Sequence, residues 1–253
     1  MKANPLAIIA ATCALVTASQ GATMFGVQFI NSVGDSVTLL SSETAGLVPQ
    51  SNFNPMAGTT GSNVALKDET GATTTTLLTY SARGLFTVNV PNAPASPDEK
   101  LNSHIINGTN GTQPTFTVTA IPFTLYDLIV YTLNDNQRLQ RITLSGIGSF
   151  TVNSPNPSLA GYVDGNVATA YIYTQGTTNS LTPVTNSNYV RFTGLTAASL
   201  TITSDARPGT FGNNGQNDNG FINGFQIVQI PEPTSLSLLG ICGTLALLRR
   251  RRA

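Results

Sequence analysis

The sequence has few charged side chains, one histidine and no tryptophan. Its 253 residues include 12 basic and 12 acidic side chains, or 9%, where an ordinary soluble domain has about 25%. A net charge of zero excludes a strongly basic nucleic-acid-binding protein. Because His104 is the only histidine, metal sites built from several histidines are excluded as well. We therefore expect no cofactor and no histidine-based metal centre.

Cysteine is nearly absent from the sequence. The two cysteines, Cys13 and Cys242, both lie in the hydrophobic ends of the chain. The residues between these ends contain no cysteine, so they can form no disulfide and support no thiol chemistry. The central part must therefore be stabilised by its own hydrophobic core, which a chain of this length can bury.

The N-terminal end has the pattern of a secretory signal. Lys2 is followed by an apolar run at Pro5–Val16 and then by small and polar residues up to Ala22. The run is too short to span a bilayer, which needs about 20 residues. We predict a signal peptide over residues 1–22, with a helical apolar segment.

The C-terminal end contains a second hydrophobic segment followed by positive charges. Residues 231–253 begin with Pro231, Glu232 and Pro233 and continue through an apolar run at Leu236–Leu248. As a helix this run would reach roughly 20 Å, less than the bilayer core of about 30 Å. The sequence then ends with a group of four arginines, which favours retention on the cytoplasmic side: Arg249, Arg250, Arg251 and Arg252.

This arrangement resembles the PEP-CTERM sorting signal of bacterial exported proteins. The resemblance implies that a membrane-embedded exosortase recognises Pro231, Glu232 and Pro233 and cleaves nearby. It also implies that the arginines act as a membrane stop before the body is delivered to the cell surface or extracellular matrix. The two prolines disfavour helix and keep the motif extended, a form that a processing enzyme can bind.

The body, residues 23–230, has an all-β pattern. Short runs rich in Val, Ile, Thr, Phe and Tyr are separated by Gly, Asn, Pro and Ser. Alternation predicts strands at Thr115–Ile121, with Phe116, Val118 and Ala120 inside, and at Ser199–Thr203, with Leu200 and Ile202 inside. Continuous apolar runs at Leu125–Leu133 and Phe221–Ile230 predict central strands covered on both faces. Thr73–Thr76 is expected to be an edge strand or a loop. The fold class is therefore a two-sheet, jelly-roll-type sandwich.

Several short segments of the body resemble β-sandwich domains of uncharacterised PEP-CTERM proteins. That family is similar in type to galactose-binding-like sandwiches, and by analogy the likeness favours sugar binding. The segments are Gly26–Phe29, Ala45–Gln50 with Asn52 and Asn54, Asp98–Leu101, Tyr126–Tyr131 and Ile222–Val228.

The residues that could support catalysis are few. A Ser-His-Asp arrangement would need His104, which we expect in a turn or on the surface, and no Gly-x-Ser-x-Gly motif is present. Glycoside hydrolysis would need a pair of carboxylates. Asp127, inside an apolar run, is the most conspicuous acid, and a structural pairing role is favoured over acid-base chemistry. No catalytic residue is assigned, and we expect no enzymatic activity.

Two further segments are candidates for ligand binding. Tyr162, Tyr171 and Tyr173 could form an exposed platform for sugar rings, although tyrosine in strands commonly serves packing. The loop Ser204–Gly220 is rich in Asn and Asp, whose oxygens suit a structural Ca²⁺. Its spacing matches no known calcium loop, and a long turn requires such residues anyway.

The sequence thus predicts a non-enzymatic exported protein, located transiently at the membrane and then at the cell surface or outside the cell. The expected partners are an exosortase-type enzyme and, for the body, matrix or carbohydrate. A secreted polysaccharide-active enzyme is the alternative. An ice-binding-like protein is a weaker alternative, because it would need a flat, regular threonine array that irregular strand lengths argue against.

Overall fold

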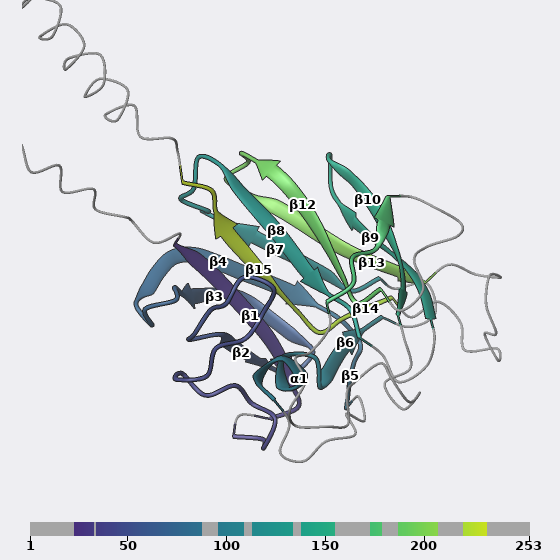
Figure 1. The fold of residues 1–253 in the computed structure, drawn as a ribbon, viewed down its shortest axis with the longest axis horizontal. Coiled ribbons are helices and arrows are strands. Elements are labelled where there is room, and N and C mark those ends of the chain that lie inside the picture. The colour runs from purple at the N-terminus through teal and green to yellow at the C-terminus, as the bar shows by residue number, and fades with distance from the viewer. Residues whose placement is uncertain are drawn as a thin grey trace, which may run out of the picture.

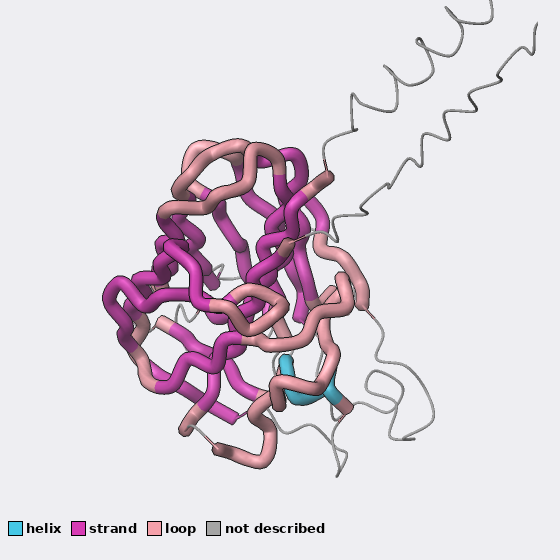
Figure 2. Tube along the Cα trace, turned by 90° about the vertical axis from the view of Figure 1, so that its left-hand side faces the viewer, coloured by secondary structure: helices cyan, strands magenta, loops and turns pink. Residues whose placement is uncertain are grey.

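The body consists almost entirely of strands. The computed structural model describes residues 23–32, 34–87, 96–108, 113–133, 138–154, 173–178, 187–206 and 220–231. Within these ranges the chain forms three β-sheets and one five-residue helix, α1 (Pro97–Leu101). Figure 2 shows this short helix beside the strands. The predicted N-terminal signal helix and C-terminal hydrophobic helix lie outside the described residues.

Two large sheets and one small sheet make up the fold (Figure 1). The five-stranded sheet has the order β12 (Tyr189–Leu195), β8 (Tyr126–Tyr131), β15 (Gly224–Gln229), β1 (Met24–Ile30) and β2 (Asn54–Ala57). The seven-stranded sheet has the order β11 (Thr177–Thr178), β10 (Gly148–Ser154), β9 (Arg138–Leu144), β13 (Leu200–Ala206), β7 (Thr115–Thr119), β4 (Thr73–Ser81) and β3 (Thr60–Lys67). The small sheet has the order β14 (Phe221–Ile222), β6 (His104–Asn107) and β5 (Gly84–Thr87). Adjacent strands are antiparallel except β1 and β2, which are parallel.

The main hydrophobic core lies between the two large sheets. It combines Phe25 and Phe225 of the five-stranded sheet with Phe116 of the seven-stranded sheet. Alternation places these side chains inside because successive residues of a strand point to opposite faces. The predicted inward residues Phe116, Val118, Leu200 and Ile202 are all buried, which confirms those assignments. Ala120 is exposed instead, with a positive φ of 55°, because the strand ends at Thr119.

A second hydrophobic cluster covers the outer face of the five-stranded sheet. It joins Met24, Ile129 and Val228 of the sheet to residues such as Phe53 and Leu101. The central strands β1, β8 and β15 are therefore buried on both faces. For β8 and β15 the continuous apolar runs predict this burial. The result is a β-sandwich with an additional layer on one side. Its jelly-roll connectivity stays a prediction.

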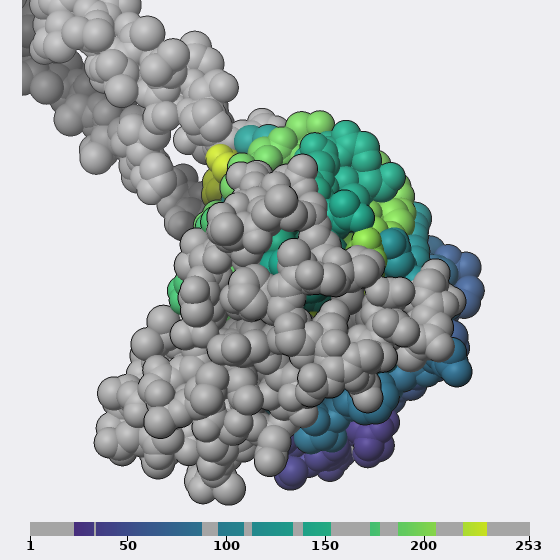
Figure 3. All heavy atoms as spheres, turned by 90° about the vertical axis from the view of Figure 1, so that its right-hand side faces the viewer, coloured from purple at the N-terminus to yellow at the C-terminus, as the bar shows by residue number. Residues whose placement is uncertain are grey.

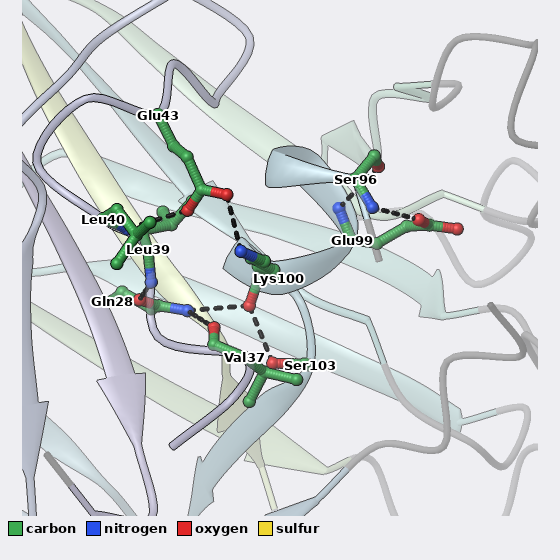
Figure 4. A network of polar contacts seen from close by, with 9 residues as sticks. All are labelled: Gln28, Val37, Leu39, Leu40, Glu43, Ser96, Glu99, Lys100 and Ser103. Atoms are coloured by element: carbon green, nitrogen blue, oxygen red, sulfur yellow. Dashed lines mark hydrogen bonds and ion pairs between the residues drawn. The ribbon is translucent and has the colours of Figure 1, made fainter. Parts of the chain in front are cut away.

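The additional layer is an irregular segment, residues 31–32 and 34–53, here called the covering segment, together with α1. Gln28 of β1 is fully buried under it. The Gln28 Nε2 donates to the carbonyls of Val37 (2.9 Å) and Lys100 (2.7 Å), and its Oε1 accepts from the Leu39 N–H at 3.0 Å (Figure 4). One side chain thus ties β1 to both the covering segment and α1.

A second buried amide, Gln226 of β15, holds the other part of the covering segment. Its Nε2 donates to the Val48 carbonyl at 2.8 Å and to Gln50 Oε1 at 3.0 Å. Its Oε1 accepts from the Tyr131 hydroxyl, which in turn accepts from the Leu47 N–H at 2.8 Å. This network satisfies backbone groups of an irregular segment that would otherwise be buried without partners.

Gly46 is required by this packing. Its φ is +94°, and a Cβ at this position would lie 2.5 Å from Gln226 Oε1. Only glycine combines a left-handed backbone with so close an approach. The close packing of the Ala45–Gln50 segment against Gln226 therefore explains why position 46 is a glycine.

The two ends of the body lie side by side. Met24 of β1 pairs with Val228 of β15, and the Gln229 N–H donates to the Thr23 carbonyl at 3.0 Å. The Ile230 N–H then donates to the Leu125 carbonyl at 2.9 Å, and Pro231 follows directly. Both predicted membrane-directed ends therefore leave the body at one corner.

Thr73–Thr76 is not an edge strand or a loop. It begins β4, an interior strand of the seven-stranded sheet that pairs with β3 and, from Leu77 onward, with β7. Thr76 is fully buried, and its hydroxyl donates to the Ala120 carbonyl at 3.0 Å. A run of four threonines carries no alternation of hydrophobicity, so the sequence could not show that one of them faces inward.

We predict that Tyr131→Phe destabilises the body by about 1–3 kcal/mol, because Gln226 and the Leu47 N–H lose a buried partner. The matched control is Tyr189→Phe, since the Tyr189 hydroxyl makes only an exposed 3.5 Å contact with Gln175. The control should change stability by less than about 0.5 kcal/mol. Denaturant unfolding of the two variants measures the difference, and equal losses would contradict the proposed role of Tyr131.

Candidate functional site

The outer face of the seven-stranded sheet presents rows of hydroxyl side chains. Thr117 of β7 pairs with Thr79 of β4 and with Thr201 of β13. A longer row crosses five strands in register and contains Ser81, Thr115, Thr203, Thr143 and Ser149. These eight residues are here called the threonine face. Neighbouring strands lie about 4.8 Å apart, and residues two apart along a strand lie about 6.7 Å apart.

The threonine face is accessible and uncharged. Each of its eight side chains is partly or fully exposed, while the alternate residues of the same strands lie in the main core. The hydroxyls of Thr117 and Thr201 are 3.2 Å apart and form a hydrogen bond. In Figure 3, which shows one face of the molecule, the described residues run from purple and blue at the lower right to green at the top.

An open groove of about 550 Å³ lies at one end of the long row. Thr203, Thr143 and Ser149 line it together with the turn between β9 and β10. In that turn Ile147 has 61% of its surface exposed, an unusual position for a large aliphatic side chain.

Arg141 and Asp205 form an ion pair in the wall of this groove. They are opposite each other on β9 and β13, and Arg141 Nη2 lies 2.7 Å from Asp205 Oδ2. Their side chains are 37% and 25% exposed, so both groups can be reached from solvent. Within the part of the chain that the structure describes, Arg141 Nε and the neighbouring Thr151 Oγ1 are buried without a hydrogen-bond partner.

Asp127 has the structural role that the sequence favoured. Its carboxylate is 4% exposed and lies on the outer face of β8. Asp127 Oδ2 accepts from Arg191 Nε at 2.8 Å and Nη2 at 2.6 Å, and Oδ1 accepts from the Gly194 N–H at 3.0 Å. The pair holds the β12 bulge between Phe192 and Leu195 against β8.

His104 is buried, so the expectation of a turn or surface histidine is wrong. It lies in β6 with 1% of its surface exposed. Nδ1 is 3.2 Å from Ser103 Oγ, and Nε2 is 3.4 Å from both Asp35 Oδ2 and Thr87 Oγ1. Burial lowers the pKa of His104, and the Asp35 carboxylate opposes that shift. Its polar sequence context hid this burial, because its neighbours Asn102 and Ser103 are buried too.

Tyr173 belongs to a cluster of aromatic side chains and does not form an open platform. Its ring packs against Tyr131 and Tyr189 with centroids 5.7 and 6.0 Å apart. Its hydroxyl donates to Asp98 Oδ1 at 2.7 Å, and Asp98 also accepts from the Gly46 N–H at 2.7 Å. Burial raises the pKa of Asp98 despite these hydrogen bonds. The other two candidates, Tyr162 and Tyr171, lie outside the described residues.

The proposed calcium loop is described only at its ends. Asp205 is engaged by Arg141, and Ser204 donates to Gln140 and to the Phe221 carbonyl. Residues 207–219 lie outside the described ranges. No group of three or more His, Cys, Asp or Glu side chains that could hold a metal ion occurs among the residues described.

The sorting motif begins at Pro231, directly after the β15 segment of the body. Pro231 is exposed and follows directly after the last backbone hydrogen bond of the β15 segment. Glu232, Pro233 and the arginines Arg249, Arg250, Arg251 and Arg252 lie outside the described residues. None of the helices in the described ranges has the length and hydrophobicity that a membrane span requires.

Comparison with known proteins identifies the C-terminal segment. Residues 229–252 match the family model of the PEP-CTERM protein-sorting motif. The chain is therefore an exported protein that is sorted to the cell surface, and it carries the PEP-CTERM motif through which exosortase processes such proteins. The match begins at Gln229, the last residue of β15.

No curated protein matches the chain in sequence. Among solved structures, the ANXUR1 extracellular domain from Arabidopsis thaliana is similar with a TM-score of 0.39 and 14% identity, over 83% of this chain and 49% of that chain. The chain thus spans about half the length of that structure, and a similarity of this size adds nothing to the fold described above.

The threonine face and the groove were not predicted from the sequence. The alternating threonines in TFTVT and LTITSD were recognisable as the outward residues of two strands. Which strands pair, and in which register, depends on contacts between residues distant in the sequence, such as Thr117 with Thr201, 84 positions apart. That information was not available from local patterns.

We predict that acidification destabilises the body through His104. Its pKa is below the ordinary 6.5 in the folded state, so the neutral ring contributes stability above that pH and the contribution is lost as the pH falls below it. His104→Gln should therefore lose less stability than the parent protein between pH 7 and pH 5. Thermal unfolding at both pH values measures this difference.

Asp35→Asn provides the matched control for this pH dependence. Removing the carboxylate lowers the pKa of His104 further, since Asp35 is the group that raises it. Asp35→Asn should therefore lose more stability than the parent over the same interval. An identical pH response in all three proteins would show that folding does not lower the pKa of His104.

Proposed function

We propose that this exported protein is a non-catalytic surface or matrix component whose sandwich body binds neutral polysaccharide through the threonine face. The sorting tail would hold the protein transiently at the membrane until exosortase removes it. The observation that carries the proposal is the pair of uncharged hydroxyl rows on one sheet face. Hydroxyls can both donate and accept hydrogen bonds, as sugar hydroxyls do.

The absence of charge on the threonine face supports a neutral partner. An ionic ligand would gain little from threonine and serine side chains, and charged surfaces lose affinity as salt screens them. A neutral sugar chain can replace the water on many hydroxyls at once. Each contact contributes little, so binding would depend on the length of the rows.

The polysaccharide-active enzyme is the competing function, and the groove supports it less well. Glycoside hydrolysis uses two carboxylates about 5–10 Å apart. Among the described residues that line the groove, Asp205 is the one carboxylate, and it is paired with Arg141. The groove therefore suits binding better than hydrolysis.

Ice binding is favoured by the same threonine rows, which cross strands of five to nine residues in register. Unequal strand length thus does not prevent an array. However, adjacent strands twist by about 20–25° relative to each other, so a row that crosses five strands cannot stay planar over its whole length. A twisted row matches a flexible polymer better than a crystal plane.

Binding can be tested with a double variant, Thr117→Val and Thr201→Val. Valine keeps the branched shape and removes the hydroxyl, so the sheet should remain intact. We expect the processed protein to lose about tenfold in retention on an insoluble neutral glucan, or about 1.4 kcal/mol. Thr193→Val, an exposed threonine on β12 of the other sheet, is the control and should bind normally.

Two activity measurements on the same proteins separate the alternatives. Reducing sugar released from the glucan, and abolished by Asp205→Asn, would replace binding by hydrolysis as the function. Inhibition of ice recrystallisation lost in the double valine variant, without any glucan retention, would favour ice binding. Retention that is equal in all variants would contradict the threonine face as the binding surface.

Processing can be tested by mass spectrometry of the exported protein. Residues up to Ile230 are held in backbone hydrogen bonds at the corner of a central strand. We therefore expect the mature chain to end at or after residue 230 and to lack the arginines. A shorter product, ending within Gly224–Gln229, would contradict the assignment of β15 as part of the mature body.

A further inference from the structure

We infer that the groove beside Arg141 and Asp205 is a subsite for a single uncharged sugar residue, which anchors a polysaccharide chain at one end of the threonine face. This inference rests on the proposed function. Its lining includes an ion pair, three hydroxyl side chains and one exposed aliphatic side chain: Arg141, Asp205, Thr143, Thr203, Ser149 and Ile147. Each of these groups matches a different part of a pyranose ring.

The ion pair selects for an uncharged ligand. Arg141 and Asp205 neutralise each other at 2.7 Å, so the groove has no unpaired charge from these two residues. An anionic sugar would have to compete with Asp205 for the guanidinium, and a cationic sugar would compete with Arg141 for the carboxylate. A neutral sugar can bind without breaking the pair.

The same pair can hold two adjacent sugar hydroxyls. The partly exposed Asp205 carboxylate can accept from one hydroxyl, and the partly exposed Arg141 guanidinium can donate to the next. Hydrogen bonds to charged groups are shorter and stronger than those between neutral groups.

Ile147 supplies the apolar contact that sugar binding requires. Sugar rings have a C–H face, and sites without aromatic residues can cover it with an aliphatic side chain. Ile147 lies between Gly146 and Gly148 in the β9–β10 turn and is 61% exposed at the edge of the groove. Its exposure is unfavourable in the free protein and would be relieved by a bound ring.

The groove is continuous with the threonine face. Thr203, Thr143 and Ser149 belong both to the groove and to the long row, which continues to Thr115 and Ser81. A chain held in the groove can therefore extend along the row. The volume of about 550 Å³ lies within the usual range for small-molecule sites, about 300–1,000 Å³.

The test measures the binding of soluble hexasaccharides to the processed protein by calorimetry. The probes are neutral gluco-, xylo- and manno-hexaose, with hexagalacturonate and chitosan hexamer as charged comparisons. We expect at least one neutral hexamer to bind and both charged hexamers to bind more weakly. Asp205→Asn and Ile147→Ser should each weaken the neutral hexamer by about tenfold, the effect of losing one charged hydrogen bond or one apolar contact.

Thr193→Val is the matched control, because Thr193 is exposed on β12 of the other sheet and belongs neither to the groove nor to the threonine face. It should change hexamer affinity by less than about threefold. Ile147→Ser alters an exposed side chain in a turn, so it keeps the test valid if Asp205→Asn fails to fold.

Three results would overturn the groove assignment. These are equal affinity in the parent and both groove variants, tighter binding of a charged hexamer, and retention on insoluble glucan with no hexamer binding. In the first and third cases the threonine face can still bind polysaccharide, so the proposed function survives without the groove. Loss of both glucan retention and hexamer binding in the parent protein would overturn both proposals.

Discussion

The fold depends on two buried glutamines that connect a sheet to a segment without regular structure. Strands β1, β8 and β15 are covered on both faces, and the covering segment on the outer face is neither helix nor sheet. Its buried backbone groups need partners, and Gln28 and Gln226 provide them from the sheet surface. A buried amide that keeps its hydrogen bonds is favourable, whereas one left unpaired is costly. Gln28 and Gln226 therefore stabilise the additional layer by pairing its buried backbone groups.

The strands were predictable where one local rule decides them. Alternation in β7 and β13 predicted both strands and all their inward residues except Ala120. The continuous apolar runs predicted β8 and β15, although the second run, Phe221–Ile230, also contains β14 of the small sheet. The sorting motif was equally accessible, because its three parts are contiguous at the end of the chain. The covering segment and α1 were not predicted. Neither has a hydrophobic period. The position of α1 depends on a hydrogen bond from Gln28, 72 positions away, and that of the covering segment depends in part on Gln226, 178 positions from Val48.

The candidate site likewise depends on tertiary contacts that local sequence patterns do not show. Threonine can face solvent or the core of a sheet, as Thr79 and Thr76 do within one strand. Only the pairing of β4, β7, β13 and β9 turns separate threonines into rows and brings Arg141 opposite Asp205. His104 shows the reverse case, a polar sequence context that is buried because loops pack over it. In both cases tertiary contacts determine whether the side chain is buried or exposed, which composition alone does not.

The low charge of the sequence is consistent with the way the surface is built. Most proteins remain soluble through charged side chains, but a charged face would also bind ions and charged polymers nonspecifically. Rows of threonine keep a sheet face hydrated without attracting either sign of charge, and β-branched side chains stabilise the strands that carry them. The single ion pair in the groove, Arg141 with Asp205, adds strong hydrogen-bonding groups without adding net charge. Under the proposed function, such a surface would bind neutral polymers in preference to charged ones, and binding would depend on the length of the rows because each hydroxyl contact is weak.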